Sequence, residues 1–154
     1  MPIAIKKILF VAAALSACCT LINGQNVPAV NEATTTISEK NAGASDSIIA
    51  SAFSNHESNL QVYGQGVVTR VLPDDNIGSR HQRFILKLAS GQTLLIAHNI
   101  DFAPRISALR KGDTVQFYGE YEWSLKGGVI HWTHRDPKGV HAAGWLELKG
   151  KKYQ

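Results

Sequence analysis

The spacing of apolar residues changes from a helical period to a strand period at about residue 60 of the chain. Upstream, an Asp46-Ser47 pair can cap a helix, and it is followed at helical spacing by Ile48, Ile49, Ala52, Phe53 and His56. Downstream, apolar and polar residues alternate in several short segments, which is the pattern of strands with one buried face. The folded part of the chain is therefore predicted to begin with a short helix and to continue as β-structure.

Five strands are predicted from the alternating segments, which are separated by turns rich in glycine, proline or aspartate. They cover residues 61–72, 81–89, 93–98, 115–123 and 129–134. Between the third and the fourth, residues 100–109 carry apolar side chains at helical spacing. This order of elements is that of the OB-fold, a five-stranded Greek-key barrel. We predict a mainly β, OB-like barrel with one helix between strands 3 and 4 and a short N-terminal helix; an open α+β sheet is the alternative.

The N-terminus has the pattern of an export signal. Residues 1–17 are predicted as a lipoprotein-type signal peptide, because two lysines precede an apolar run of about ten residues, too short to span a bilayer. Leu15-Ser16-Ala17-Cys18 resembles the bacterial lipobox, in which the cysteine is acylated. The alternative is an ordinary signal peptide that is cut further on, near Gly24.

The composition beyond the signal divides the chain into a tether and one domain. Residues 18–46 are rich in small and polar residues without a sustained apolar period, so they are predicted as a flexible tether, and the OB-like domain covers residues 47–154. The chain has two cysteines, Cys18 and Cys19, so no disulfide crosslinks the domain. These features predict a domain in the bacterial periplasm that a lipid on Cys18 anchors to the membrane. A soluble periplasmic or secreted protein is the alternative.

The charge of the chain limits its partners. The net charge is +4 with neutral histidines, which favours acidic partners but falls short of a nucleic-acid-binding protein. We therefore expect the partners to be the membrane, through the lipid anchor, and an unidentified envelope ligand or protein, rather than nucleic acid. No cofactor is expected.

Histidine and tryptophan residues gather near the C-terminus. Residues 127–145 contain three of the six histidines and two of the three tryptophans. OB barrels bind oligomers with aromatic platforms and basic residues, so the favoured function is a binding module for a small or oligomeric ligand or for a partner protein. The candidate ligand-binding residues are Arg80, His81, Arg83, His98, His134, Asp136 and His141.

Two alternatives depend on the same segment. A metal site could use His131, His134, Asp136 and His141, but positions three apart on a regular strand point to opposite faces, so His131 and His134 would not reach one ion. No metal ligand is therefore predicted. A hydrolase, for example of phosphodiesters, would use His134 and Asp136 as base and orienting carboxylate, with nearby arginines as phosphate contacts. The sequence shows neither a nucleophile elbow nor a phosphate-binding glycine loop.

Several of these side chains also have a purely structural interpretation. Trp123 shares a strand face with Val115 and Phe117 and is expected in the core. His98 fits a buried histidine whose hydrogen bonds are satisfied within the protein. Trp145 fits a residue that holds the C-terminal tail against the barrel.

Five segments spread over the predicted barrel have a distinctive composition. They are Asp74-Asp75, Gly78-Ser79-Arg80-His81-Gln82, Ile96-Ala97-His98-Asn99-Ile100-Asp101, Gly119-Glu120-Tyr121-Glu122-Trp123 and His131-Trp132-Thr133-His134-Arg135-Asp136-Pro137-Lys138-Gly139. Together they resemble a family of exported bacterial proteins that is known as a domain of unknown function. The resemblance covers residues 60–154 and implies an exported single domain without implying an activity. The chain departs from that family at Arg135 and Val140, where related sequences often carry histidine and arginine.

Overall fold

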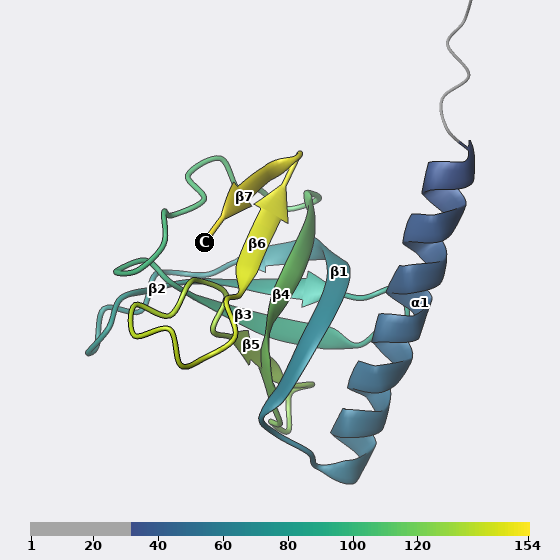
Figure 1. The fold of residues 1–154 in the computed structure, drawn as a ribbon, viewed down its shortest axis with the longest axis horizontal. Coiled ribbons are helices and arrows are strands. Elements are labelled where there is room, and N and C mark those ends of the chain that lie inside the picture. Colours follow the sequence, from purple (N-terminus) through teal and green to yellow (C-terminus); the bar gives the residue numbers. More distant parts are fainter. Residues whose placement is uncertain (1–31) are drawn as a thin grey trace, which may run out of the picture. The chain divides into compact units, whose positions relative to one another are not determined.

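The computed structural model describes the backbone of residues 32–154 and the side chains from residue 43 onward. The predicted signal peptide, Cys18 and the first part of the predicted tether lie outside the described residues. Figure 1 shows the elements, which are α1 (Glu32–Asn55), β1 (Leu60–Val71), β2 (His81–Lys87), β3 (Thr93–Asn99), β4 (Thr114–Glu122), β5 (Val129–His131), β6 (Trp145–Leu148) and β7 (Lys151–Tyr153). Within this part of the chain, no helix combines the length and the apolar character needed to cross a membrane.

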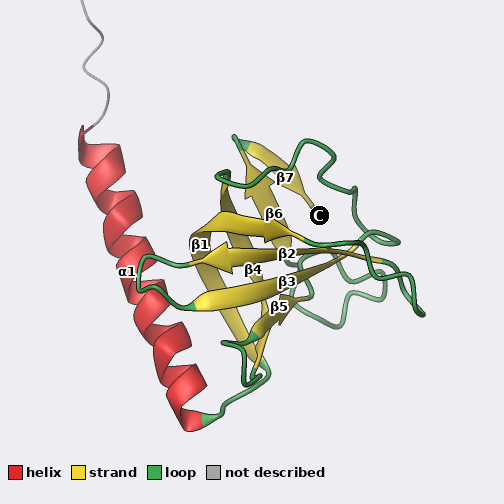
Figure 2. Cartoon of the chain, turned by 180° about the vertical axis from the view of Figure 1, so that it is seen from behind, coloured by secondary structure: helices red, strands yellow, loops and turns green. Residues whose placement is uncertain are grey.

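The first five strands close into a barrel. Their order is β1-β2-β3-β5-β4, and β1 also pairs with β4, which joins the two ends of the sheet. All neighbours are antiparallel except β3 and β5, which run parallel. Figure 2 shows the strands curving around one another beside α1. This connectivity is that of the OB-fold, so the prediction of a mainly β, OB-like barrel is confirmed.

The barrel interior is filled by the alternating apolar side chains of every strand. In β4, for example, Val115, Phe117 and Tyr121 are buried while the residues between them are partly exposed. Gly64 on β1 lies opposite Phe117, and a Cβ there would collide with the Phe117 ring. The glycine therefore makes room for an aromatic ring in the core, consistent with a glycine that marks a close approach within a strand.

The prediction of a helix between strands 3 and 4 is wrong, since residues 100–111 form turns and irregular backbone. Ile106 and Leu109 are still buried, as the apolar spacing indicated. The buried Gln82 side chain explains the backbone path: its amide donates to the Ile106 carbonyl at 3.0 Å, and its oxygen accepts the Ile106 N–H at 2.8 Å. Because a side chain satisfies these backbone groups, they do not enter a helix ladder.

The N-terminal helix is longer than predicted. It begins at Glu32 and not at Asp46-Ser47, so residues 32–46 of the predicted tether are helical. Asp46 does not cap a helix; its carboxylate accepts the Ser90 N–H at 2.8 Å, on the β2–β3 turn. Ile49 is fully buried and belongs to the barrel core, which shows that α1 is packed as part of the same unit.

The chain after β5 adds two strands that the sequence pattern did not predict. The last barrel strand ends at His131, three residues earlier than predicted, and Trp132 follows with a φ of 50°. β6 then pairs with β4, and β7 pairs with β6. Trp145 begins β6 opposite Tyr118, so the interpretation that this tryptophan holds the C-terminal segment against the barrel is confirmed.

Candidate functional site

Two adjoining hollows lie on the outer face of β2, β3 and β5. The first has a volume of about 390 Å³ and the second about 280 Å³. Both are lined by His81, Ala97 and His131, so they form one continuous depression, which we call the histidine groove. The first hollow adds Asp75, Arg83, Leu95, Glu122 and Val129, and the second adds Ser79, Asn99, Phe102, Trp132 and His134.

The strand register creates this groove. His81 pairs with Asn99 and Arg83 with Ala97, which places these outward side chains side by side on β2 and β3. The parallel pairing of Leu95 with Val129 then brings the outer face of β5 against the same surface. Residues from three strands that are distant in sequence therefore line one depression.

Two groove histidines have the same hydrogen-bonding arrangement. Nδ1 of His81 lies 2.7 Å from the Ser79 carbonyl oxygen, and Nδ1 of His134 lies 2.7 Å from that of Arg135. A carbonyl oxygen only accepts, so Nδ1 carries the proton in both rings. When these imidazoles are neutral, Nε2 is the acceptor nitrogen that remains for a ligand.

The end of β5 explains why His131 and His134 meet in one groove. A regular strand would have pointed them to opposite faces, but β5 ends at His131 and the backbone turns at Trp132. Both histidines line the second hollow. The Gly144 N–H donates to the His134 carbonyl oxygen at 2.9 Å, which ties the returning chain to this turn.

Trp132 is the aromatic end of the groove. His141 stacks on its indole at a centroid distance of 4.2 Å and an interplanar angle of 10°, and His134 lies at 5.2 Å. Trp132 and Phe102 also line a third hollow of about 530 Å³, together with Asp136, Pro137, Lys138 and Val140. The third hollow shares these two aromatic residues with the second and extends the groove along the β5–β6 connection.

The carboxylate of Asp136 shapes the β5–β6 connection. It accepts the backbone N–H groups of Lys138 at 2.9 Å, Val140 at 2.8 Å and His141 at 2.9 Å. These backbone hydrogen bonds, first those from Lys138 and His141, lower the pKa of Asp136. The ionised Asp136 carboxylate therefore stabilises a tight loop, and its hydrogen bond from the His141 N–H helps to position His141 beside Trp132.

His98 lies inside the barrel and not on its surface. Its ring is fully buried; Nδ1 is 2.8 Å from the Thr133 hydroxyl and Nε2 is 3.2 Å from the Pro104 carbonyl oxygen. Because a carbonyl only accepts, Nε2 donates and Nδ1 accepts from the hydroxyl, which fixes one neutral tautomer. Burial lowers the pKa of His98 to about 4. The structural interpretation of this residue is confirmed.

The two candidate arginines are engaged by acidic neighbours. Arg80 donates to Asp101 at 2.7 Å and is not among the groove-lining residues. Arg83 lines the first hollow, donates to the Pro73 carbonyl at 3.2 Å and lies 3.6 Å from Asp75. Only Arg83 of this pair is therefore placed to contact a ligand in the groove.

Sequence reasoning missed two glutamates beside the groove. Glu120 and Glu122 lie on the outer face of β4, and Glu120 pairs with His131 across the β4–β5 ladder. His131 Nε2 is 3.3 Å from Glu120 and 3.7 Å from Glu122, while His141 Nε2 is 2.6 Å from the other oxygen of Glu120. This bond to Glu120 raises the pKa of His141. The Glu-x-Glu spacing predicts that both side chains share one strand face, but it does not by itself indicate that His131 lies beside them.

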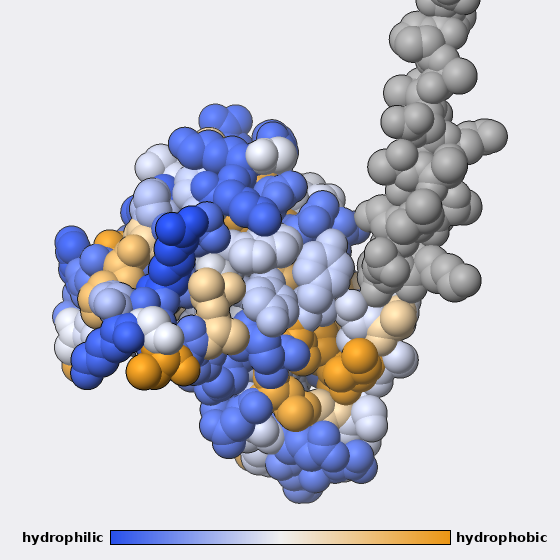
Figure 3. All heavy atoms as spheres, in the orientation of Figure 1, coloured by the Kyte–Doolittle hydropathy of each residue, from blue (hydrophilic) through white to orange (hydrophobic). Residues whose placement is uncertain are grey.

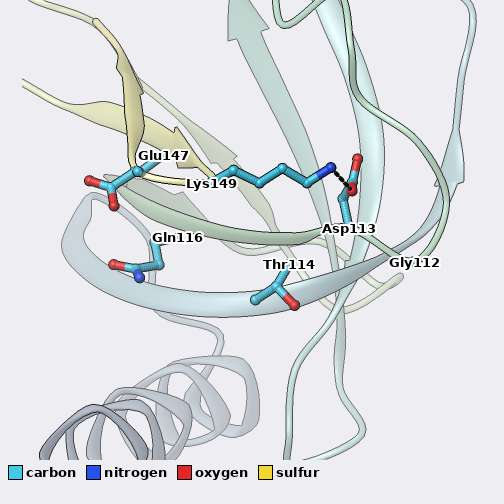
Figure 4. A pocket seen from close by; sticks show the side chains of 7 residues that line it. Gly112, Asp113, Thr114, Gln116, Glu147 and Lys149 are labelled. Carbon is cyan, nitrogen blue, oxygen red and sulfur yellow. Dashed lines mark ion pairs between the residues drawn. The ribbon is translucent and has the colours of Figure 1, made fainter. Parts of the chain in front are cut away.

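A further hollow of about 420 Å³ lies near β4, β6 and the turn that precedes β4 (Figure 4). Its lining is polar, and Lys149 spans it to reach Asp113 at 3.1 Å. On the face seen in Figure 1, Figure 3 shows a mainly hydrophilic surface with apolar groups in separate patches. The hollow lacks the aromatic and histidine side chains of the groove, so we consider the groove the stronger candidate site.

The comparisons with known proteins give a family and no activity. The chain belongs to the family described as "Protein of unknown function (DUF3465)", which it matches over residues 32–154. No curated protein matches the chain. The resemblance to a domain of unknown function is thus confirmed, and the matched region begins where α1 begins, so the helix is part of the family's domain.

Proposed function

We propose that this chain is a binding module of the bacterial cell envelope and that its ligand is an oligosaccharide lying along the histidine groove. The observation that supports this function is the continuity of the groove across the outer face of β2, β3 and β5. OB-folds bind oligosaccharides and oligonucleotides on the face of their second and third strands. The third hollow lengthens the depression beyond Trp132, which suits an extended ligand.

The chemistry of the groove suits a neutral, hydroxyl-rich ligand. Its lining combines the apolar side chains of Leu95, Ala97 and Val129 with an acceptor, His81 Nε2, and the donor groups of Arg83. Hydroxyl groups of a sugar both donate and accept, and the C–H face of a sugar ring packs on an aromatic surface. Trp132 offers such a surface at the end of the groove.

The charge of the groove argues against nucleic acid and other phosphate polymers. Arg83 is the one lysine or arginine that lines the first two hollows, and it is close to Asp75. Glu122 adds a further carboxylate to the wall. Binding of a phosphate chain requires several unpaired cations along its path, whereas the first two hollows carry one arginine and two carboxylates.

The hydrolase alternative receives less support from the geometry. Asp136 binds three backbone N–H groups, and Nδ1 of His134 faces the Arg135 carbonyl, so the two side chains are engaged separately. His141 and Glu120 do form a close pair, but both nitrogens of His141 face acceptors, Glu120 and the Ala142 carbonyl. That arrangement favours an imidazolium, which has no lone pair with which to act as a base.

The envelope location rests on the N-terminal sequence and is tested separately. We expect mass spectrometry of the mature protein to show Cys18 as the new N-terminus, carrying a diacylglycerol thioether and an N-acyl chain. Several acyl chains of this kind anchor a protein stably. An unmodified N-terminus beyond Cys18 would exclude the lipid anchor.

The binding function is tested with soluble glycans that represent the envelope. We expect the full chain to bind muropeptides or chito-oligosaccharides in isothermal titration calorimetry. Trp132→Ala should weaken binding about tenfold, roughly 1.4 kcal/mol, since it removes the aromatic end of the groove. Trp145→Ala is the matched control, because Trp145 contacts Tyr63 and Tyr118 outside the groove. Equal losses in the two variants, or no binding of either glycan class, would contradict the proposal.

A further inference from the structure

Three side chains next to the groove have the arrangement of metal ligands. One oxygen each of Glu120 and Glu122 and one ring nitrogen of His131 lie within 4.8 Å of one another. Glu120 and Glu122 come from the outer face of β4, and His131 comes from the last position of β5. The β4–β5 ladder, in which Glu120 pairs with His131, holds the three groups on a rigid part of the barrel.

The two nitrogen–oxygen distances are longer than in a charge-assisted hydrogen bond and close to the separation of neighbouring ligands on one ion. His131 Nε2 lies 3.3 Å from Glu120 and 3.7 Å from Glu122. Zinc bonds to nitrogen and carboxylate oxygen measure about 2.0–2.2 Å, so neighbouring ligands of a tetrahedral ion lie roughly 3.3–3.6 Å apart. A charge-assisted hydrogen bond would instead bring nitrogen and oxygen to about 2.7–2.9 Å.

The state of the His131 ring is consistent with a ligand nitrogen. Within the described side chains, its Nε2 atom is shielded from solvent and makes no hydrogen bond of acceptable geometry. A buried polar atom without a partner is rare in a native protein, and an ion is one of the groups that satisfies it. Nε2 is also one of the two ring nitrogens through which histidine binds metals.

A second layer of contacts orients the cluster. The other oxygen of Glu120 lies 2.6 Å from His141 Nε2, and His141 is held by its stacking on Trp132 and by its contact with the Ala142 carbonyl. Ligating carboxylates are commonly fixed by such outer hydrogen bonds, which tune metal affinity. The same loop that shapes the aromatic end of the groove therefore orients one of the three ligands.

We infer that Glu120, Glu122 and His131 bind a divalent first-row metal ion, with zinc as the representative. One imidazole and two carboxylates form a sulfur-free donor set of the kind that zinc accepts. Three protein ligands leave a fourth position of a tetrahedral ion for an exchangeable group. Glu122 and His131 also line the groove, so a ligand oxygen there would lie near that position. The inference does not depend on the proposed glycan, since the ion binds without it.

The experiment measures zinc binding to the full chain purified without a histidine tag and treated with a chelator. Equilibrium dialysis with zinc chloride is expected to give one zinc ion per chain, and magnesium at the same concentration is expected not to displace it. Glu122→Gln and His131→Asn should each weaken zinc binding at least tenfold, because each removes a ligand. His141→Phe keeps an aromatic ring beside Trp132 but removes the nitrogen that contacts Glu120. It should lower the zinc affinity about 10- to 100-fold, as is typical when a partner that orients a metal ligand is lost.

The controls are matched to the ligands. Glu147→Gln removes a carboxylate from β6, and His56→Gln removes an exposed imidazole at the end of α1; both should leave the zinc affinity unchanged. If Glu122→Gln and His131→Asn bind zinc like the wild-type chain, or if no saturable zinc binding is found, the inference is wrong. Should His131→Asn fail to fold, Glu122→Gln, which changes a partly exposed side chain, decides the question alone.

Discussion

At the scale of single residues, the fold decides which histidines can meet a ligand. Alternation along the third strand placed His98 on a defined face, but the sequence did not show whether that face was the inside of the barrel. The structure buries His98 between Thr133 and Pro104, while His81 and His134 line the groove. Residue type therefore identified the candidates, and the tertiary contacts separated them: His134 is also buried, at 4% exposure, yet it lines the groove, whereas both ring nitrogens of His98 have partners inside the barrel.

The buried state of His98 predicts a stability that depends on pH. The folded pKa of His98 is about 4 and the ordinary value is 6.5, so between these pH values the unfolded chain binds the proton more tightly. The stabilisation is complete above pH 6.5 and is lost as the pH falls toward 4, by about 3 kcal/mol. Urea unfolding at pH 7 and pH 4.5 should show this loss in the wild-type chain.

The His98→Gln variant isolates this contribution. His141, whose pKa is raised, acts in the opposite direction: its stabilisation is present at low pH and is lost as the pH rises through its folded pKa. Both chains retain His141, so the difference between their pH profiles reports on His98. We expect the free energy of unfolding to fall less between pH 7 and pH 4.5 in His98→Gln than in the wild-type chain. An identical fall in both chains would show that His98 is not its cause.

At the scale of elements, the alternating strands were predictable because alternation directly records which face is buried. The predicted helix at residues 100–109 was wrong because the same buried positions, Ile106 and Leu109, are reached by irregular backbone that Gln82 holds. β6 and β7 were missed because four and three residues are too few to establish a period. The early start of α1 was missed because residues 32–46 carry no sustained apolar period.

The packing of α1 on the barrel is tested by two neighbouring isoleucines. Ile49 is fully buried in the core, whereas Ile48 is 57% exposed. Ile49→Ala should lower the free energy of unfolding by about 3 kcal/mol, because it removes buried methyl groups and leaves a cavity. Ile48→Ala, the same chemical change on the exposed side, should stay within roughly 0.5 kcal/mol of wild type. Chemical denaturation measures both, and similar losses would show that α1 is not packed as described.

At the scale of the whole molecule, the closed barrel creates the groove. The sequence predicted Arg83, His81 and His134 as candidates, and the structure places all three along one depression. The sequence could not predict that β5 would run parallel to β3, or that this pairing would add His131 to the same surface. Pairing between distant strands follows from closure of the whole sheet and not from local spacing.

The dependence on pairing between distant strands also explains why two glutamates were not identified from the sequence. Glu120 and Glu122 show an ordinary strand alternation, and their importance arises only when β5 places His131 beside them. Asp136 shows the opposite case, since its position in the histidine-rich segment suggested a ligand contact while its carboxylate caps the loop. Local composition thus located the region of the site and left the role of each side chain to the tertiary contacts.

Amide NMR of the uniformly ¹⁵N-labelled chain measures directly whether the histidine groove binds a glycan. Titration with soluble muropeptides or chito-oligosaccharides is expected to shift the amide signals of His81, Ala97, His131 and Trp132, which lie along the groove. Signals around Lys149 and Gly112, in the separate polar hollow, should stay in place. Shifts confined to that hollow, or no shifts with either glycan, would show that the histidine groove does not bind glycans.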